Sequence, residues 1–177
     1  MIRAFETHRI RKTRELSSSL WDFRTLPDDC PSVSFPIAVP GCWETYPQTR
    51  TYRGKASYEK QFEAGGHIRL VFEGVSHTAD VFLDGQQVAS HYNAYTPFDA
   101  VIPDLKKGRH SLKVLVDNAY GPGSTLHIPN DYQTYGGISR GVTLEFLQDA
   151  FISGLYFTPV RTKEEWHGNV EITVQNL

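Results

Sequence analysis

The chain has 177 residues, of which 40% are hydrophobic and 12% aromatic, and its formal net charge is -2. This length and composition are typical of a folded domain with a substantial core, not of a disordered or fibrous chain. A slightly acidic chain lacks the broad basic surface of a dedicated nucleic-acid binder, so no nucleic-acid partner is expected. No apolar run approaches the ~20 residues of a membrane span, so no membrane partner is expected either.

Two further features bear on the cellular compartment. The first eight residues lack the apolar segment of a secretory signal, which predicts a cytoplasmic protein unless a leader has been removed. Cys30 and Cys42 are the only cysteines and form no CxxC pair. They could form one disulfide, but the pattern favours two free thiols in a reducing compartment.

Apolar and polar residues alternate along much of the chain, which predicts β-strands. Asp84-Gly85 has the composition of a type I′ hairpin turn, in which both central residues need a positive φ, and Lys106 to Gly108 is expected to form another turn. About eight strands are the usual number in a two-sheet jelly roll, so the predicted fold is an all-β jelly-roll β-sandwich. Strands are expected at residues 20–23, 56–63, 68–72, 79–83, 86–91, 98–102, 112–116 and 142–147.

A long connection separates the last two of these strands. Residues 118–129 are broken by Gly and Pro and show neither strand nor helix periodicity. Loops of this length are usually functional or disordered. The segment that follows, 130–140, contains aromatic residues and an acid, which favours an ordered functional loop over disorder.

Two more strands are expected after residue 149, at 151–158 and 170–174. Two strands do not form a stable domain by themselves. They therefore either complete the sandwich or begin a second domain.

Six short motifs stand out along the chain. They are Leu20-Trp-Asp-Phe23, Val39-Pro-Gly-Cys-Trp43, the segment from Tyr52 to Phe62, the segment from Phe72 to Gly85, Tyr95-Thr-Pro-Phe98 and Tyr135-Gly-Gly-Ile-Ser-Arg140. By these motifs and their order, the chain from residue 20 to residue 158 resembles the N-terminal sugar-binding domain of glycoside hydrolase family 2, the family of β-galactosidases and β-glucuronidases. Ala94 stands before Tyr95 where the family usually has Gly, which indicates a small difference in that loop.

The resemblance implies a domain organisation. Residues 1–149 would form a jelly-roll sugar-binding domain of the galactose-binding-domain-like kind, and residues 150–177 would be the first strands of a truncated immunoglobulin-like sandwich. In this family the two catalytic glutamates lie on a later (β/α)₈ barrel, which needs ~250 residues by itself. No catalytic residue is therefore expected in this chain, and the isolated chain is expected to be inactive. The full-length protein is expected to be a homo-oligomer.

The resemblance also implies a site. An acidic residue placed as Asp131 is reaches the sugar pocket of the barrel in this family, where a carboxylate can accept hydrogen bonds from sugar hydroxyls. Asn130 and Tyr132 are further substrate-binding candidates because they are adjacent. The alternative is that Asp131 only forms an Asx turn within the loop. Arg140 is expected to pair with a carboxylate inside the sandwich.

Other residue types give weaker signals. Trp21 and Trp43 could be sugar-stacking platforms, but their motifs favour core packing. Gly136 and Gly137 are expected to supply backbone freedom. The seven histidines form no HxH or HxxxH pair, so no metal and no cofactor are expected.

Three functions remain open at this stage. The first is the N-terminal part of a family 2 glycosidase that binds a β-galactoside or β-glucuronide and docks against the catalytic barrel of its own full-length chain. The second is a free-standing, lectin-like carbohydrate-binding module, and the third is a structural interaction domain. Tyr95-Thr-Pro-Phe98 and Val75-Ser-His-Thr78 lean slightly toward the glucuronidases.

Overall fold

The structure is a computed structural model that describes residues 12–121, 128–129 and 131–177. Its regular structure is dominated by β-strands, with short 3-10 helices η2 (Trp43–Thr45) and η3 (Pro47–Thr49). The strands are β1 (Lys12–Glu15), β2 (Ser19–Thr25), β3 (Ser34–Val39), β4 (Lys55–Phe72), β5 (Val75–Ser76), β6 (Thr78–Leu83), β7 (Gln86–His91), β8 (Phe98–Asp117), β9 (Gly137–Ile138), β10 (Val142–Phe146), β11 (Ala150–Arg161) and β12 (Trp166–Asn176).

The main sheet has eight strands, with β1, β10, β4, β8, β6 and β7 as successive neighbours. β2 joins this sheet through β4 and carries β3 on its other side. All of these pairs are antiparallel. The prediction of an all-β sandwich is confirmed, whereas the jelly-roll topology stays a prediction.

Two strands are longer than the sequence pattern predicted. The segments expected as separate strands at 56–63 and 68–72 form the single strand β4, and those at 98–102 and 112–116 form the single strand β8. The reason is a bulge: the β4–β8 register shifts on both sides of Gly66, which has a φ of 84°. A bulge bends a strand without ending it, so the apolar alternation is interrupted while the strand continues.

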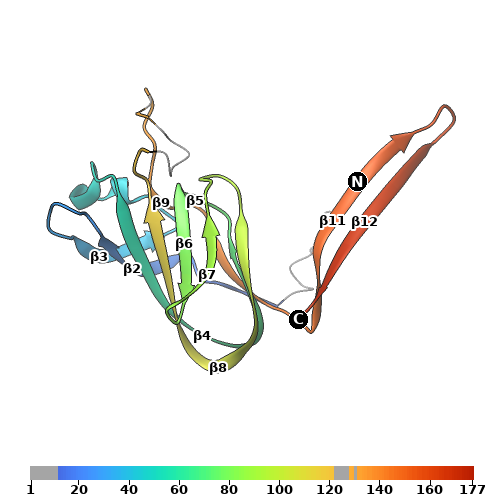
Figure 1. Cartoon of the computed structure of the whole chain (residues 1–177), viewed down its shortest axis with the longest axis horizontal. Helices are drawn as coiled ribbons and strands as arrows, with labels where there is room; N and C mark the ends of the chain where they lie inside the picture. Colours follow the sequence, from blue (N-terminus) through green and yellow to red (C-terminus); the bar gives the residue numbers. More distant parts are fainter. Residues whose placement is uncertain (1–11, 122–127, 130) are drawn as a thin grey trace.

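The bend lets β4 serve both layers of the sandwich. Its first part pairs with β2 and its last part pairs with β10, while β8 follows it throughout (Figure 1). Pro103 lies in the irregular stretch of β8 between Ile102 and Leu105, where it removes no regular ladder bond. The expected turn from Lys106 to Gly108 is likewise part of β8.

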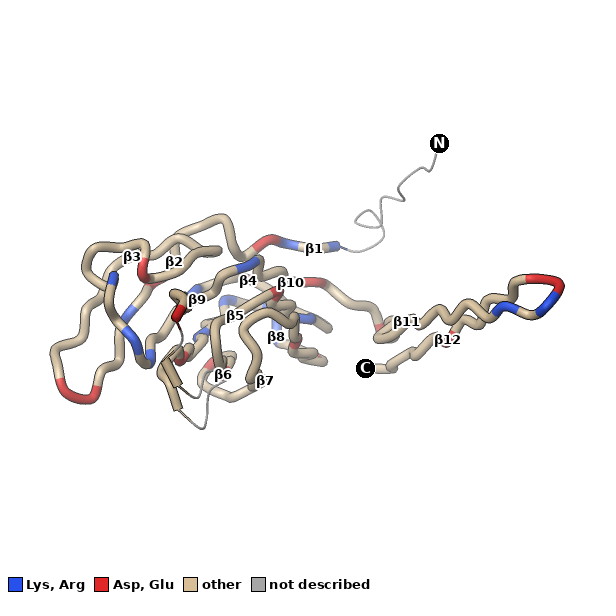
Figure 2. Tube along the Cα trace, turned by 90° about the horizontal axis from the view of Figure 1, so that it is seen from above, with Lys and Arg blue, Asp and Glu red and all other residues tan. Residues whose placement is uncertain are grey.

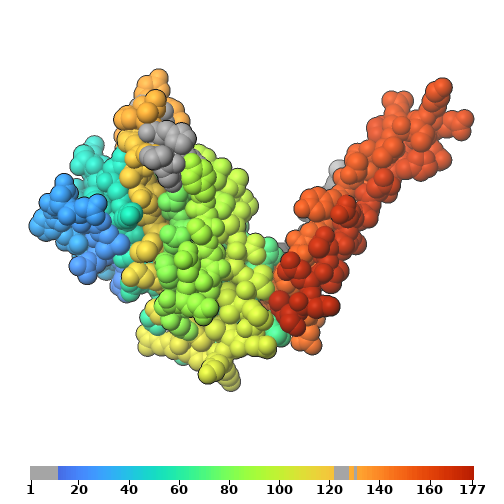
Figure 3. Space-filling model, viewed as in Figure 1, coloured from blue at the N-terminus to red at the C-terminus, as the bar shows by residue number. Residues whose placement is uncertain are grey.

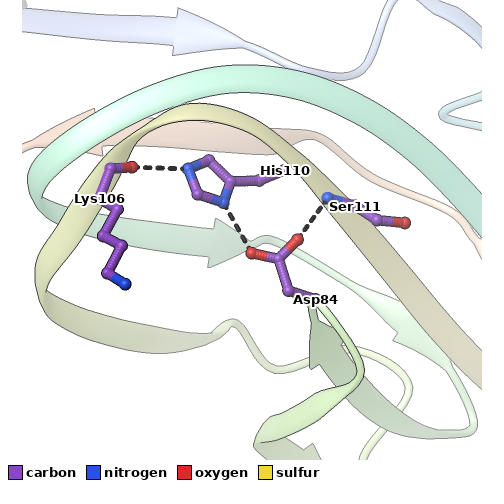
Figure 4. A network of polar contacts seen from close by, with 4 residues as sticks. All are labelled: Asp84, Lys106, His110 and Ser111. Atoms are coloured by element: carbon purple, nitrogen blue, oxygen red, sulfur yellow. Dashed lines mark hydrogen bonds and ion pairs between the residues drawn. The ribbon is translucent and has the colours of Figure 1, made fainter.

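The β6–β7 hairpin has the predicted turn. Asp84 and Gly85 have φ values of 51° and 85°. The Asp84 carboxylate also ties this turn to β8, since one oxygen lies 2.7 Å from His110 Nδ1 and the other accepts a 2.8 Å bond from the Ser111 amide (Figure 4). His110 Nε2 lies 2.8 Å from the Lys106 carbonyl, so both ring nitrogens face an acceptor.

The core lies between the layers and is rich in aromatic residues. Trp21 and Trp43 are 1% and 0% exposed, which confirms that they are core residues. Trp43 stacks on Tyr58 at a centroid distance of 6.5 Å, and Phe23 contacts both rings. Cys30 and Cys42 are free thiols, as expected.

The β11–β12 hairpin stands away from the sandwich (Figures 1 and 3). Its charged residues are concentrated at the tip, and the rest of both strands carries few charges (Figure 2). Residues on both faces are exposed, since Leu155, Tyr156 and Phe157 follow one another along β11 and are 61 to 64% exposed. No helix in the described part of the chain is long and apolar enough to cross a membrane.

Candidate functional site

The loop between β8 and β9 carries the residues that the sequence singled out. Asp131 and Tyr132 are exposed, as is Tyr135. Asn130 lies outside the described residues. The loop therefore presents a carboxylate and two phenol rings to the exterior, while the substrate-binding role of Asp131 and Tyr132 stays a prediction.

The base of this loop is closed by one oxygen atom. Glu44 Oε1 accepts a hydrogen bond of 3.0 Å from the side-chain amide of Asn118, at the start of the loop. The same oxygen accepts a bond of 2.8 Å from the backbone amide of Gly136, at its end. Glu44 is buried in η2, so both ends of the loop are tied to a carboxylate of the sandwich.

The orientation of Asn118 is fixed from its other side. Its Oδ1 accepts a 2.9 Å bond from the Gly54 amide, and its own backbone amide donates to the Gly54 carbonyl. Asn118 is fully buried. Because one amide oxygen and one amide nitrogen each have a partner, the side chain has a single satisfied orientation.

Arg53 spans the same two ends. Its guanidinium donates to the carbonyl of Asn118 at 3.0 Å and to the carbonyl of Thr134 at 3.1 Å. The guanidinium also lies 4.2 Å from the centre of the Tyr120 ring. A planar fork with several donors suits two carbonyl groups that lie apart, which a single ammonium would not bridge in the same way.

Packing against Trp43 requires a glycine at the end of the loop. A Cβ atom at Gly136 would lie 2.2 Å from Trp43 Cζ2, and the Trp43 amide donates to the Gly136 carbonyl. The predicted backbone freedom is real at Gly137, where φ is 126°. At Gly136 the reason is instead the absence of a side chain.

Burial is the largest influence on the pKa values of the ionisable groups where the loop joins the sandwich. The pKa of Glu44 is raised because the carboxylate is desolvated, and the bonds from Gly136 and Asn118 and the charge of Arg53 only partly oppose this. Glu44 Oε2 is buried and has no hydrogen-bond partner among the described residues. The pKa of His77 is lowered, first by burial and then by Arg53. The place where the loop joins the sandwich therefore contains two ionisable side chains, Glu44 and His77, that are buried away from water.

Arg140 does not have the predicted role. Its side chain is exposed, and the guanidinium donates to the backbone carbonyl of Tyr95 at 3.2 Å. The prediction of a carboxylate partner inside the sandwich is wrong, because the residue lies at the surface, where a loop carbonyl is within reach. Its contact joins the Tyr95-Thr-Pro-Phe98 loop to the segment between β9 and β10.

The exposed site residues do not lie in the neighbouring cleft. A cleft of about 650 Å³ opens beside the loop base, with Arg53 and Asp117 in its lining, but Asp131 and Tyr132 are not part of it. In the described part of the chain, no three His, Cys, Asp or Glu side chains are grouped so that they could hold a metal ion. Among the described residues, the Asp131 carboxylate is therefore exposed outside this cleft.

Sequence reasoning missed Glu44, Arg53 and Asn118. Glu44 follows the core residue Trp43 directly, and a charged residue next to a buried Trp in a turn was the available signal. Arg53 falls inside a motif that the resemblance used. Their shared role depends on contacts between distant segments, which no local pattern reveals.

Known proteins place this fold in a family. Residues 20–147 match the family described as glycosyl hydrolases family 2, sugar binding domain. The chain therefore belongs to glycoside hydrolase family 2, through its sugar-binding domain.

Individual relatives agree with this assignment. A β-galacturonidase from Eisenbergiella tayi, solved with galacturonate bound, superposes on the whole chain with a TM-score of 0.88 and 59% identity. A β-galactosidase from Thermoanaerobacter pseudethanolicus is 31% identical over 68% of the chain, and a β-glucuronidase from Bacteroides fragilis is 33% identical over 60% of it. The chain spans 18% and 16% of those two proteins and 32% of the Eisenbergiella chain.

Proposed function

We propose that this domain completes the sugar pocket of a family 2 glycosidase by presenting Asp131 to the substrate. The observation that carries the proposal is the exposed Asp131 carboxylate on a loop whose two ends are tied to Glu44 and Arg53. A carboxylate held in place can accept hydrogen bonds from adjacent sugar hydroxyls. The catalytic pair would come from a (β/α)₈ barrel of the same full-length chain, and Tyr132 and Asn130 would be secondary contacts.

The substrate class that we favour is a β-linked hexuronide. The Eisenbergiella protein, 59% identical, is described as a β-galacturonidase bound to galacturonate, and the Bacteroides relative as a β-glucuronidase. Two relatives described as β-galactosidases are 38% and 31% identical, so both are less similar than the Eisenbergiella protein. A galacturonide is therefore preferred over a glucuronide or a neutral galactoside.

The β11–β12 hairpin supports the division into domains at residue 149. A two-stranded hairpin is marginal by itself, and a large apolar surface on a soluble protein marks an interface. Because both faces are apolar, we infer that residues 150–177 begin an immunoglobulin-like domain whose other strands cover the hairpin. The exposed large apolar residues of the hairpin are Ile152, Leu155, Tyr156, Phe157, Val160, Trp166, Val170, Ile172 and Val174.

The second candidate is a free-standing sugar-binding module. It is favoured by the ordered anchoring of the loop within the domain, which does not require a barrel. It is disfavoured by the exposed apolar side chains of the β11–β12 hairpin. Titration of the purified chain with galacturonate, glucuronate and galactose separates the two, because a module binds one of them with at least millimolar affinity and a pocket fragment binds none.

The proposed role of Asp131 is tested by kinetics of the full-length protein on an aryl β-galacturonide. Asp131→Asn keeps the size of the side chain and removes its charge. We expect kcat/KM to fall by a factor on the order of 10 to 1,000, because a charge-assisted bond to the sugar is lost. Asp29→Asn, at another exposed acid, is the control and should leave kcat/KM unchanged. Wild-type kinetics for Asp131→Asn would leave the Asx-turn role as the explanation.

A further inference from the structure

We propose that Glu44 is a positioning residue for the sugar site: by joining both ends of the 118–136 loop through one carboxylate oxygen, it fixes the place to which Asp131 projects. This inference rests on the proposed contact between Asp131 and the sugar. Glu44 itself is buried and would not touch the sugar.

Glu44 binds both ends of the loop through the same oxygen atom. Glu44 Oε1 is 3.0 Å from Asn118 Nδ2 and 2.8 Å from the Gly136 nitrogen. A loop with both ends bound to one atom has its entry and exit fixed relative to each other. Only four residues separate Gly136 from Asp131 along the chain, so a displaced exit is passed on to the carboxylate.

Glu44 is an acidic residue at a buried position. Burying a carboxylate is costly unless it is hydrogen-bonded and compensated by charge. Glu44 has two donors on one oxygen, while its other oxygen is buried without a partner among the described residues. An apolar side chain would stabilise a purely structural turn without the free-energy cost of burying a carboxylate. The presence of Glu44 is therefore better explained by a function of its two hydrogen bonds.

Arg53 also holds both ends of this loop, through backbone carbonyl groups. It binds the carbonyls of Asn118 and Thr134, whereas Glu44 binds the amide groups of Asn118 and Gly136. Two side chains of opposite charge thus hold the two ends of one loop. Placement errors of about 1 Å at a reacting site can lower rates by about 100-fold, which makes such a double closure functionally valuable.

The test is a double-mutant cycle in the full-length protein, with kcat and KM measured on an aryl β-galacturonide for Glu44→Gln, Asp131→Asn and the double variant. Glu44→Gln keeps Oε1 as an acceptor but weakens both bonds. If Glu44 acts through Asp131, Glu44→Gln alone lowers kcat/KM about 5- to 50-fold and costs little more in the Asp131→Asn background. Glu44→Asp, which shortens the side chain by one methylene, should lose activity in the same non-additive way.

Two results would overturn the proposal. One is a full, additive loss for Glu44→Gln in the Asp131→Asn background, which would indicate a general effect on folding. The other is wild-type activity for Glu44→Gln while Asp131→Asn is impaired. If Asp131→Asn itself has wild-type kinetics, the proposed function fails and this inference falls with it.

Hydrogen exchange keeps the test independent of whether the variants fold. In the wild-type full-length protein, the Gly136 amide should be protected to a degree comparable to the amides of β10, because its acceptor is buried. Exchange of the Gly136 amide at the rate of an open loop would contradict the closure.

Discussion

Asn118 and Gly136 stand at opposite ends of the longest loop of the sandwich, yet both donate to the same oxygen of Glu44, at 3.0 and 2.8 Å. The loop is therefore an extension of the sandwich with a closed base, not a free connection. Asp131 and Tyr132 are exposed on a segment whose two ends are hydrogen-bonded to the same buried carboxylate. Several consequences can be measured.

The base should tolerate no side chain at Gly136. In Gly136→Ala the new Cβ would lie 2.2 Å from Trp43 Cζ2 and 2.5 Å from Asn118 Nδ2, so the core must shift. We expect a loss of about 2–4 kcal/mol in the free energy of unfolding, measured with urea. Gly108→Ala is the control, since a Cβ there meets nothing within 4 Å and the change should be nearly neutral. Equal stabilities for the two variants would contradict the packing described here.

Reversing one donor should open the base. Asn118→Asp replaces the amide that donates to Glu44 with an acceptor and brings two buried carboxylates together. We expect the free energy of unfolding to fall by about 2–4 kcal/mol at neutral pH, because one buried charge is left without compensation. The loss should shrink in acid, when one of the two groups is protonated.

Asn93→Asp is the matched control for that change. Asn93 Oδ1 accepts a bond from the Tyr95 amide, and an aspartate can accept the same bond at an exposed position. Its stability should stay within about 0.5 kcal/mol of the wild type. Similar losses of unfolding free energy in Asn118→Asp and Asn93→Asp would mean that the contact between Asn118 and Glu44 does not contribute to stability.

The Asp84–His110 pair should make stability depend on pH (Figure 4). The pKa of Asp84 is lowered, chiefly by its bond to His110. Burial alone would lower the pKa of His110, but its bonds to Asp84 and the Lys106 carbonyl outweigh this and raise it. The lowered pKa of Asp84 stabilises the folded state above pH about 4. The raised pKa of His110 stabilises the folded state below pH about 6.5, and this contribution is lost as the pH rises through the folded-state pKa.

The contribution of the pair is isolated by Asp84→Asn, because Asn tolerates the positive φ of 51° at this turn. The difference in unfolding free energy between wild type and variant should be largest near pH 5–6, about 1 kcal/mol, and should decrease toward pH 8. The measurement is urea denaturation across this pH range. A difference that does not change with pH would show that His110 carries no proton-linked stability.

The strands were predictable from alternation because a half-buried strand repeats every two residues, as β6 and β10 do. The continuity of β4 was not, because the bulge at Gly66 interrupts that repeat where the strand bends. The core position of Trp43 was predictable from its turn motif, whereas the role of Asp131 was inferred from the family motif and stays a prediction. Glu44 was missed because its partners come from two distant segments, and such contacts leave no periodic trace.

The hairpin should be the least stable part of the isolated chain. Its two strands pair only with each other, whereas β4 has neighbours along its whole length. We expect amides of β12 to exchange within seconds and amides of β4 to be protected for hours, as read by NMR. In the full-length protein β12 should become protected, and equal exchange in both proteins would contradict a covering domain.

The most direct test of the account is a crystal structure of the full-length protein with galacturonate bound. The account predicts that the Asp131 carboxylate lies about 2.6–3.1 Å from a sugar hydroxyl, with Glu44 still bonded to Asn118 and Gly136 behind it. A sugar that is bound entirely by barrel residues, with Asp131 facing solvent, would contradict the central claim.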